Sequence, residues 1–587
     1  MNIKKIKKRT YFNLLLWLLV IIFSNIIASY IYTRIDLTSE KRYTLSKTTV
    51  EMLENLDDVI YIEVYLEGDL NAGFKRLRNN TKEMLDEFKV YAKDNLEYEF
   101  KNPIKDKDQK TQNEILLQLK DKGLIPTNIQ EQDADGKMSQ QILIPGALVQ
   151  YRNNEVAVDL LKNNKRYTAE QNLNNSAQET EYEFIKAFSE LQKERKSKIG
   201  IIEGHGELNE LYMTGALDAL AEQYSIEILS IEGQLNSLRE RVMVDSTKSE
   251  VRNRYDLIII ARPDTSFTKY DQFIIDQYIM YGGKVLWLVE GTTADTDSLR
   301  FNGSFMAFVN DLNINPQLFK YGARVNPDII QDIQCGVLPI NTSYAGAKPN
   351  FVPMPWLYFP LIAPSNNHPI TKNMDVIKTQ FVSTIDAVGE NPNVKKTYLL
   401  FTSEKTKVLT APVRVSLDII GTEPDTRQFA KSNQPVAILL EGKFESFFNN
   451  HLDQNFADND LISFQEESKP TKMIIVADGD IIRNPIIRRG GQYIPLPLGS
   501  DEWFENIYYG GNLEFILNSV NYLLDDQGVM SVRTRELKLR LMDRLKVKDE
   551  KLKWQMINIL VPVMIIIVFG LLLQYFRKRK NIKLLTN

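Results

Sequence analysis

Cysteine and histidine are almost missing from this chain of 587 residues, and their scarcity excludes several kinds of site. Cys335 has no second cysteine to pair with, so no disulfide can form within the chain and hydrophobic cores must provide the stability. The histidines, His205, His368 and His451, form no His-Glu-x-x-His pattern and no Cys/His spacing typical of zinc. The sequence therefore predicts no metal site and no cofactor.

Nucleotide-binding and nucleic-acid-binding patterns are missing as well. Gly-Lys pairs occur at 283–284 and 442–443, but neither is followed by the Ser or Thr that ends a phosphate-binding P-loop. The net charge is only −4, and no basic stripe with interleaved aromatic residues is present. We therefore expect neither an ATPase nor a nucleic-acid-binding protein.

Charge is absent from two long apolar runs, one near each end of the chain. Residues 11–32 and residues 554–576 contain no Asp, Glu, Lys or Arg. About 20 apolar residues cross a bilayer as a helix, and aromatic residues such as Tyr11 and Tyr32 stand where membrane interfaces favour them. We expect a transmembrane helix from each run, in preference to two buried soluble helices or a cleaved N-terminal signal peptide.

Basic residues flank these runs unevenly. Segment 1–10 contains a cluster of Lys and Arg, whereas Arg34 is the only basic residue close behind the first run. The positive-inside rule therefore places this segment in the cytoplasm, and a second crossing returns the basic tail 577–587 to the same side. The basic stretch within 531–553 then lies outside, which is acceptable because long translocated regions are largely exempt from the rule.

The region between the runs has the composition of folded α/β domains. The chain is 43% hydrophobic and 25% charged, which is typical of globular proteins. In a first domain, residues 36–191, a β-branched run ending at Gly68, a helical pattern over 74–93 and a strand closed by Pro103 predict a parallel β-α-β unit. A hairpin turning at 153–154 and a helix over 169–192 follow. A thioredoxin-like arrangement is one option, but no Cys-x-x-Cys is present, so redox chemistry is excluded.

Apolar strands alternate with amphipathic helices in a second region, residues 197–530. KIGIIEG, YDLIIIARP and KVLWLVEG are predicted strands, and the helix KYDQFIIDQYIMYGG ends at a Gly-Gly cap. This alternation predicts a Rossmann-like parallel sheet with helices on both faces. The order of elements resembles class I glutamine amidotransferase-like folds. Those enzymes use a Cys at a strand-to-helix elbow, and Cys335 lies in no such elbow, so a scaffold without that chemistry is expected.

Turns that follow these strands provide the candidate site residues. The carboxyl ends of parallel strands form the ligand crevice of such sheets, and both a GHGE turn and an Arg-Pro-Asp turn should lie there. The candidate ligand-binding residues are Gly204, His205, Gly206, Glu207, Arg262 and Asp264. Backbone N–H groups at the turn could hold an anion beside a titratable His205. Alternatively, the glycines only permit a tight turn and His205 bonds locally; catalysis is least expected, because no nucleophile accompanies the turn.

Two further segments leave alternatives open. The acidic pair in Asp478-Gly479-Asp480 follows an apolar run and could bind a cation, although a turn is the more common role of such a sequence. The stem 531–553 contains leucines spaced both as in a strand and as in a helix. It is read either as an arm that couples the outer body to membrane subunits or as a basic stem near lipid headgroups.

The whole chain resembles one known family. The segments that carry the likeness include RIDLTSEKRYTLS, IGIIEGHGELN, YGARVNPDIIQD, WLYFPLIAPSNNHPITKNMD, PVAILLEGKFES and RTRELKLRLMD, in that order between the apolar runs. They resemble the gliding-motility-associated ABC transporter auxiliary proteins (GldG) of Bacteroidota-type bacteria. The resemblance implies a non-catalytic subunit of the bacterial inner membrane, largely periplasmic, with a separate ABC permease and a separate P-loop ATPase as partners. A degenerate periplasmic hydrolase-like binding protein and an envelope scaffold without ATP remain the alternatives.

Overall fold

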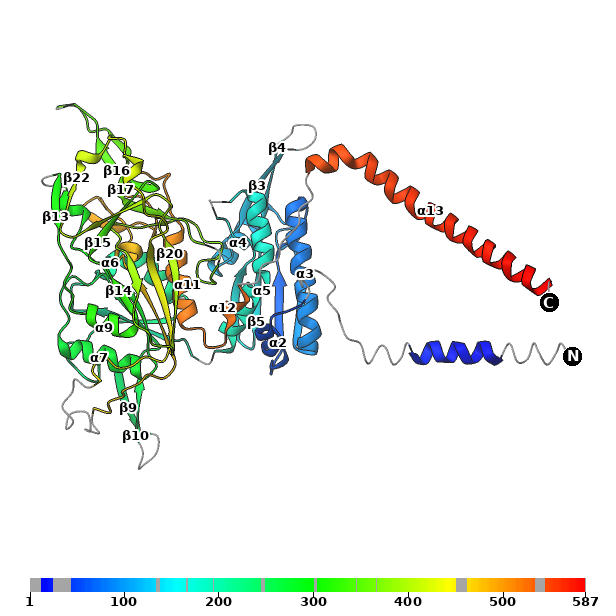
Figure 1. Ribbon diagram of the computed structural model, residues 1–587, viewed down its shortest axis with the longest axis horizontal. Coiled ribbons are helices and arrows are strands. Elements are labelled where there is room, and N and C mark those ends of the chain that lie inside the picture. The colour runs from blue at the N-terminus through cyan, green and yellow to red at the C-terminus, as the bar shows by residue number, and fades with distance from the viewer. Residues whose placement is uncertain are drawn as a thin grey trace. The chain divides into compact units, whose positions relative to one another are not determined.

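The computed structural model describes residues 12–24, 44–132, 138–164, 167–193, 195–243, 249–299, 303–344, 346–365, 367–449, 462–533 and 544–585. Two compact units make up the chain, Met1–Arg535 and Glu536–Asn587. The first contains a smaller N-terminal α/β part and a larger part built on a seven-stranded sheet (Figure 1).

The N-terminal part contains the predicted β-α-β unit. Strand β1 (Ile60–Val64) pairs in parallel with β2 (Leu96–Phe100), and helix α3 (Ala72–Ala92) connects them. On the other side of β1, strand β5 (Gly146–Tyr151) forms the expected hairpin with β6 (Asn154–Asp159), and its turn lies at 152–153, one residue before the predicted position. Around this sheet lie α2 (Lys47–Glu54), α4 (Gln109–Asp121), β3 (Thr127–Gln132) and β4 (Met138–Leu143).

Helix α5 (Ala169–Gln192) has the bounds that the sequence predicts. Thr168 begins it with a capping box, in which the Thr168 hydroxyl accepts from the Gln171 N–H and the Gln171 side chain accepts from the Thr168 N–H. Its apolar face packs on α3, where the ring of Phe88 meets Phe184 edge-on with 6.3 Å between centroids. Burial of this face against the sheet fixes α5 in the core of the N-terminal part.

The larger part is organised by a seven-stranded sheet in the order β20-β23-β24-β12-β11-β7-β8. From β8 to β24 neighbouring strands are parallel, whereas β23 and β20 are antiparallel additions at one edge. The strands are β7 (Lys198–Glu203), β8 (Ser225–Ser230), β11 (Leu257–Ala261), β12 (Lys284–Leu288), β20 (Val394–Phe401), β23 (Pro435–Gly442) and β24 (Thr471–Val476).

Helices cover both faces of this sheet. Alternate residues of β11 enter different hydrophobic clusters: Ile259 packs with residues of α6 (Glu210–Ala221) and α11 (Gly511–Leu523), and Ile260 with residues of α7 (Lys269–Met280). All residues of β11 are buried, as expected for a central parallel strand. The predicted α/β layering is therefore present in this part of the chain.

Small antiparallel sheets, formed by segments on either side of β20 between β12 and β23, were not foreseen from the sequence. They comprise β13 (Ser304–Ala307), β14 (Ala323–Val325), β15 (Asp328–Asp332), β16 (Cys335–Asn341), β17 (Phe351–Ile362), β18 (Ile377–Lys378), β19 (Ile385–Ala387), β21 (Thr406–Thr410) and β22 (Val413–Ser416), with helix α9 (Asn315–Tyr321). Hairpins β9 (Arg239–Met243) with β10 (Ser249–Asn253), and β25 (Ile486–Arg489) with β26 (Gln492–Pro495), complete the strands. Most of these strands are short, so they leave little periodicity in the sequence.

The two parts of the first unit are joined by buried polar contacts. Arg533 donates to the carbonyls of Pro369 and Lys372 at 3.0 and 2.8 Å, and its Nε lies 3.6 Å from Glu179 Oε1 on α5. Helix α12 (Val529–Val532) follows the large part in sequence, yet its apolar side chains pack into the N-terminal core. The chain thus returns to its first part before residue 533.

Apolar helices occur near both ends of the described chain. Helix α13 (Arg544–Leu585) contains a segment, Glu550–Lys578, that is long and apolar enough to cross a membrane, and an 18-residue stretch within it has a mean hydropathy of 2.9. At the N-terminal end a shorter apolar helix covers Phe12–Ser24; the rest of the predicted span 11–32 lies outside the described residues. Within the predicted stem, residues 544–553 are helical, and the leucines at 537–541 lie outside the described residues.

Candidate functional site

The turns that follow β7, β11, β12 and β24 meet at the carboxyl edge of the large sheet, as the sequence predicts for its candidate residues. The N–H of Asp264 donates to the carbonyl of His205 at 3.0 Å, which joins the GHGE turn to the Arg-Pro-Asp turn. Arg262 from the same turn reaches Asp480, which follows β24. Four loops of the sheet therefore lie together at one edge.

His205 is held by carboxylates on both sides of its ring. Its Nδ1 lies 3.2 Å from Glu207 Oε1, and its Nε2 lies 3.2 Å from Asp271 Oδ2 on α7. The ring stacks on Phe267 with 3.9 Å between centroids. Burial alone would lower the pKa of His205, but the hydrogen bonds to Glu207 and Asp271 outweigh it and raise the pKa. The contact with Glu207 is local, as in the second alternative for this turn, whereas Asp271 is distant in the sequence; both ring nitrogens are engaged.

Gly206 permits a close approach that no other residue could make. Its φ is +72°, and a Cβ added there would lie 1.6 Å from Asp264 Oδ1. Two features therefore favour glycine at this position: the positive φ, and the neighbouring carboxylate of Asp264, which leaves no room for a side chain.

A Gly206→Ala substitution is expected to destabilise the chain by about 1–3 kcal/mol, because it adds an overlap to the backbone strain. Gly389→Ala is the matched control: its φ is +74°, but nothing lies within 4 Å of the added Cβ. The midpoint of urea unfolding, followed by tryptophan fluorescence on the detergent-solubilised chain, should fall clearly further for Gly206→Ala. Equal shifts would show that the contact with Asp264 does not matter.

Three buried carboxyl groups lie together beside these turns. Glu290 follows β12, Asp478 and Asp480 follow β24, and oxygens of all three lie within 4.8 Å of one another. Burial raises the pKa of Glu290 and of Asp478 well above the usual range, and the neighbouring acidic groups raise both further. Glu290 therefore keeps its proton well above the pH at which an exposed glutamate loses it.

Arg262 supplies positive charge to this cluster. Its Nε lies 3.1 Å from Asp480 Oδ1, and its Nη2 lies 2.6 Å from Asp295 Oδ2. Burial would lower the pKa of Arg262, but the surrounding carboxylates, Asp480 first, outweigh it and raise the pKa. Arg483 also contacts Asp480, with 3.2 Å between Nη1 and Oδ1.

The Asp-Gly-Asp segment forms a turn. The N–H of Asp480 donates to Asp478 Oδ1 at 2.8 Å, and the N–H of Gly479 donates to Glu290 Oε1 at 2.7 Å. This local bond is the kind by which Asp stabilises turns, so the turn expected from the sequence is present. Oxygen ligands of this type also suit a hard divalent cation, and Glu290, Asp478 and Asp480 are the residues that could hold one. The positive charge of Arg262 already neutralises part of the negative charge of these carboxylates.

A cavity of about 1000 Å³ opens beside the cluster, and its lining includes Asp295, which contacts Arg262, and Arg483, which contacts Asp480. Its walls come from the large sheet's edge, the inserted β16 and β17, and the β25–β26 hairpin. The rings of Phe351 and Trp503 lie 4.5 Å apart on this wall, and burial lowers the pKa of Lys378. The cavity combines aromatic surface with charged groups, which is typical of a ligand-binding site.

Cys335 and His368, the two residues that an amidotransferase-like chemistry would require, both have shifted pKa values. Burial raises the pKa of the Cys335 thiol to about 11, whereas a nucleophilic cysteine needs a lowered pKa. Burial lowers the pKa of His368 to about 4, so this side chain is neutral near pH 7. His451 lies outside the described residues.

Glu290, Asp295 and Arg483 are the residues of this edge that sequence reasoning missed. Glu290 ends the run KVLWLVEG, and the rule that drew attention to the turns after β7 and β11 would have found it. Arg483 and Asp295 lie further along loops, where no pattern in the sequence shows that they converge.

Comparisons with known proteins match most of the chain. The family described as an ABC-type uncharacterized transport system matches residues 196–519, and a domain of unknown function matches residues 39–150. An uncharacterized protein of Borreliella burgdorferi is 22% identical over 597 residues, covering 98% of this chain and 99% of that protein. Among solved structures, the mmIFT52 N-terminal domain is 14% identical with a TM-score of 0.30, over 56% of this chain and 98% of that chain. A likeness at that level carries no argument.

Proposed function

The chain belongs to the ABC transporter auxiliary family, and from this premise we propose that it is a membrane-anchored, non-catalytic subunit of an ABC transporter associated with bacterial gliding motility. The observation that carries the proposal is the family match over residues 196–519, which include the whole seven-stranded sheet and its carboxyl edge. The family implies association with transporter components. A separate permease and a separate P-loop ATPase are the partners we propose.

The chain's own chemistry supports an auxiliary role. It has no P-loop, so ATP hydrolysis must come from another subunit. Two apolar segments do not line a transport pathway, which usually requires several helices with polar groups. We propose that helix α13 and the run 11–32 anchor the chain in the inner membrane, with both termini cytoplasmic and the folded body periplasmic.

The carboxyl edge of the sheet is the surface that we propose for ligand or partner binding. The GHGE turn, Arg262 and Asp264 belong to this edge but do not line the adjacent cavity, which would provide the space for a ligand. In open α/β sheets ligands bind at this edge, and the aromatic and charged lining of the cavity suits such a role.

Deletion of the gene tests the proposal in the organism that carries it. Loss of this chain, of the permease or of the ATPase should give the same defect, and loss of two together should add nothing. In a gliding species that defect is loss of surface spreading. Additive defects, or normal spreading without this chain, would contradict the proposal and favour an envelope scaffold that acts without ATP.

A further inference from the structure

A second cavity, of about 820 Å³, lies at the junction between the two parts of the first unit. We call it the junction cavity. Helix α5 and the β5–β6 hairpin form one side, and the loop between α6 and β8 together with the end of α11 forms the other. We propose that this cavity binds a small multivalent oxyanion, with Lys186 and Lys193 as its principal ligands. The proposal is independent of the transporter role.

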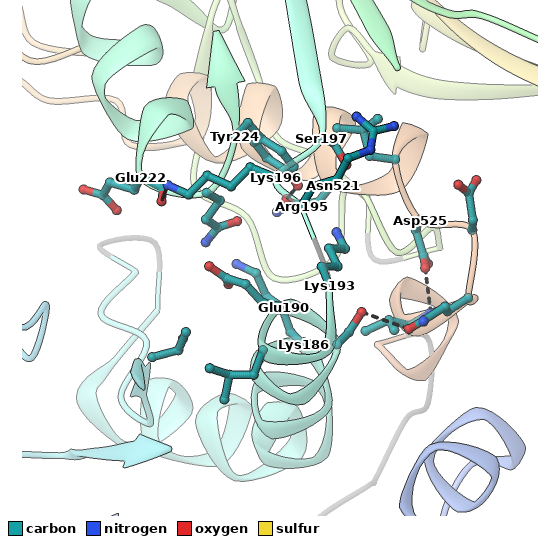
Figure 2. A pocket seen from close by; sticks show the side chains of 18 of the residues that line it. Lys186, Glu190, Lys193, Arg195, Lys196, Ser197, Glu222, Tyr224, Asn521 and Asp525 are labelled. Atoms are coloured by element: carbon teal, nitrogen blue, oxygen red, sulfur yellow. Dashed lines mark hydrogen bonds between the residues drawn. The ribbon is translucent and has the colours of Figure 1, made fainter. Parts of the chain in front are cut away.

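Lys186 carries the argument, because its charge faces the cavity without a close partner. Figure 2 shows Lys186 and Glu190 pointing from α5 into the cavity, toward the side that carries Glu222 and Tyr224. Among the described residues, no carboxylate oxygen lies within the 4.0 Å ion-pair distance of Lys186 Nζ. Burial lowers the pKa of Lys186, which shows that its surroundings do not fully compensate its charge.

Further basic side chains come from the segment that links the two parts. Lys193 reaches the ring of Tyr224, with its Nζ 6.0 Å from the ring centroid, and forms no ion pair among the residues that the structure describes. Lys196 donates to the carbonyl of Glu222 at 2.8 Å, at the end of α6. These groups place positive charge on both sides of the cavity.

Most acidic residues of the cavity are already paired. Asp256 accepts from Arg195 and from the backbone N–H of Lys198. Asp525 accepts the N–H groups of Val529 and Met530 at the start of α12 (Figure 2). Asp526 pairs with Lys284 at 2.7 Å, and Glu155 with Lys122 at 2.8 Å. The charges of these four residues are therefore compensated locally, whereas Lys186, Lys193 and Lys196 form no ion pair among the described residues.

Glu190 and Glu222 line the cavity without an ion pair among the described residues, and Glu190 gives a test whose expected direction is opposite to that of the lysine variant. Glu190 lies one helical turn after Lys186, and burial raises its pKa. A carboxylate in this position repels an anion, so Glu190 should limit affinity rather than provide it.

The unpaired lysines define the chemistry of the ligand. Ammonium groups bind phosphate and carboxylate oxygens as point charges, and two of them in one partly enclosed space favour a ligand with more than one negative group. Because the walls come from both parts of the unit, such a ligand would hold the junction together and stabilise the chain by mass action.

Titration calorimetry on the full chain in detergent, at pH 7 and constant ionic strength, tests the proposal with pyrophosphate and with citrate as probes. Binding of either supports an oxyanion site, and the preferred probe tells a phosphate ligand from a carboxylate ligand. Lys186→Met should weaken binding about tenfold, because it removes a charged hydrogen-bond donor. Lys75→Met, at an exposed position of α3, is the matched control and should bind as the wild type does.

The Glu190→Gln variant provides a second test if Lys186→Met folds poorly. It should bind the same probe more tightly than the wild type, an effect that general damage to the fold would not produce. Failure of the wild type to bind either probe would overturn the proposal. So would unchanged affinity in Lys186→Met with a native unfolding midpoint, or weaker binding in Glu190→Gln.

Discussion

Replacing Arg533 by methionine is expected to destabilise the first unit by about 3–5 kcal/mol, because it leaves a buried charge without its partner. The Arg533 side chain is 8% exposed and that of Glu179 is 2% exposed, so water cannot replace the lost contact. Two backbone carbonyls also lose their donor. The expected result is a large fall in the midpoint of urea unfolding, together with faster proteolysis between the N-terminal part and the large part.

Two further variants separate loss of the charge pair from loss of packing. Glu179→Gln combined with Arg533→Met removes both charges and should recover part of the stability. Arg427→Met removes an ion pair with Asp425 whose arginine side chain is 89% exposed, and it should change the midpoint very little. A fall for Arg533→Met no larger than that for Arg427→Met would show that this contact does not hold the junction.

Replacing Arg262 by methionine is expected to destabilise the chain by a similar amount, about 3–5 kcal/mol near neutral pH. The substitution removes the cation that faces Asp480 and Asp295 and leaves the buried carboxyls of Glu290 and Asp478 with more negative neighbours. Methionine keeps a Cβ at the unusual φ of +55°, so the backbone strain of Arg262 is unchanged.

The stability lost in Arg262→Met should depend on pH in a definite direction. Glu290 and Asp478 have pKa values raised above their ordinary values of 4.5 and 3.8, so above those values the folded state binds protons that the unfolded state has released. Stability from these groups is therefore present at low pH and falls as pH rises toward the raised pKa values. Without Arg262 the pKa values of Glu290 and Asp478 rise further. The difference in free energy of unfolding between the wild type and Arg262→Met should therefore be smaller at pH 5 and larger at pH 8.

Urea unfolding of the Arg262→Met variant and the wild type at both pH values measures this difference. Adding Glu290→Gln to the variant should reduce its deficit at pH 8, because it removes one ionisable group from the cluster. Arg262→Lys keeps a positive charge and should lose less. A deficit that is the same at pH 5 and pH 8 would mean that Arg262 acts by packing alone.

Local patterns in the sequence were enough to predict the elements that carry strong periodicity. The bounds of α5 follow from its capping box and its apolar stripe, and β11 follows from an uninterrupted run of Leu and Ile. The turns after β7 and β11 could be placed at one edge because parallel strands share the direction of their ends. The contact between Asp264 and the GHGE turn agrees with that reasoning.

Contacts between distant segments could not be predicted in this way. Arg533 looked like one basic residue of a stem, yet it is buried against Glu179, which lies in α5. The carboxyl cluster joins Glu290 to Asp478 across a long insertion, and a single sequence gives no measure of that proximity. The junction cavity likewise depends on how two parts pack, which local hydrophobic patterns do not determine.

Recovery of partners from native membranes tests the central claim most directly. The chain, tagged at its C-terminus and extracted in mild detergent, should co-purify with a multi-span permease and a P-loop ATPase in fixed ratio. A truncated chain that ends before residue 544, and so lacks α13, should recover much less of both. Recovery of the full chain alone, or with envelope proteins only, would contradict its assignment as a transporter subunit.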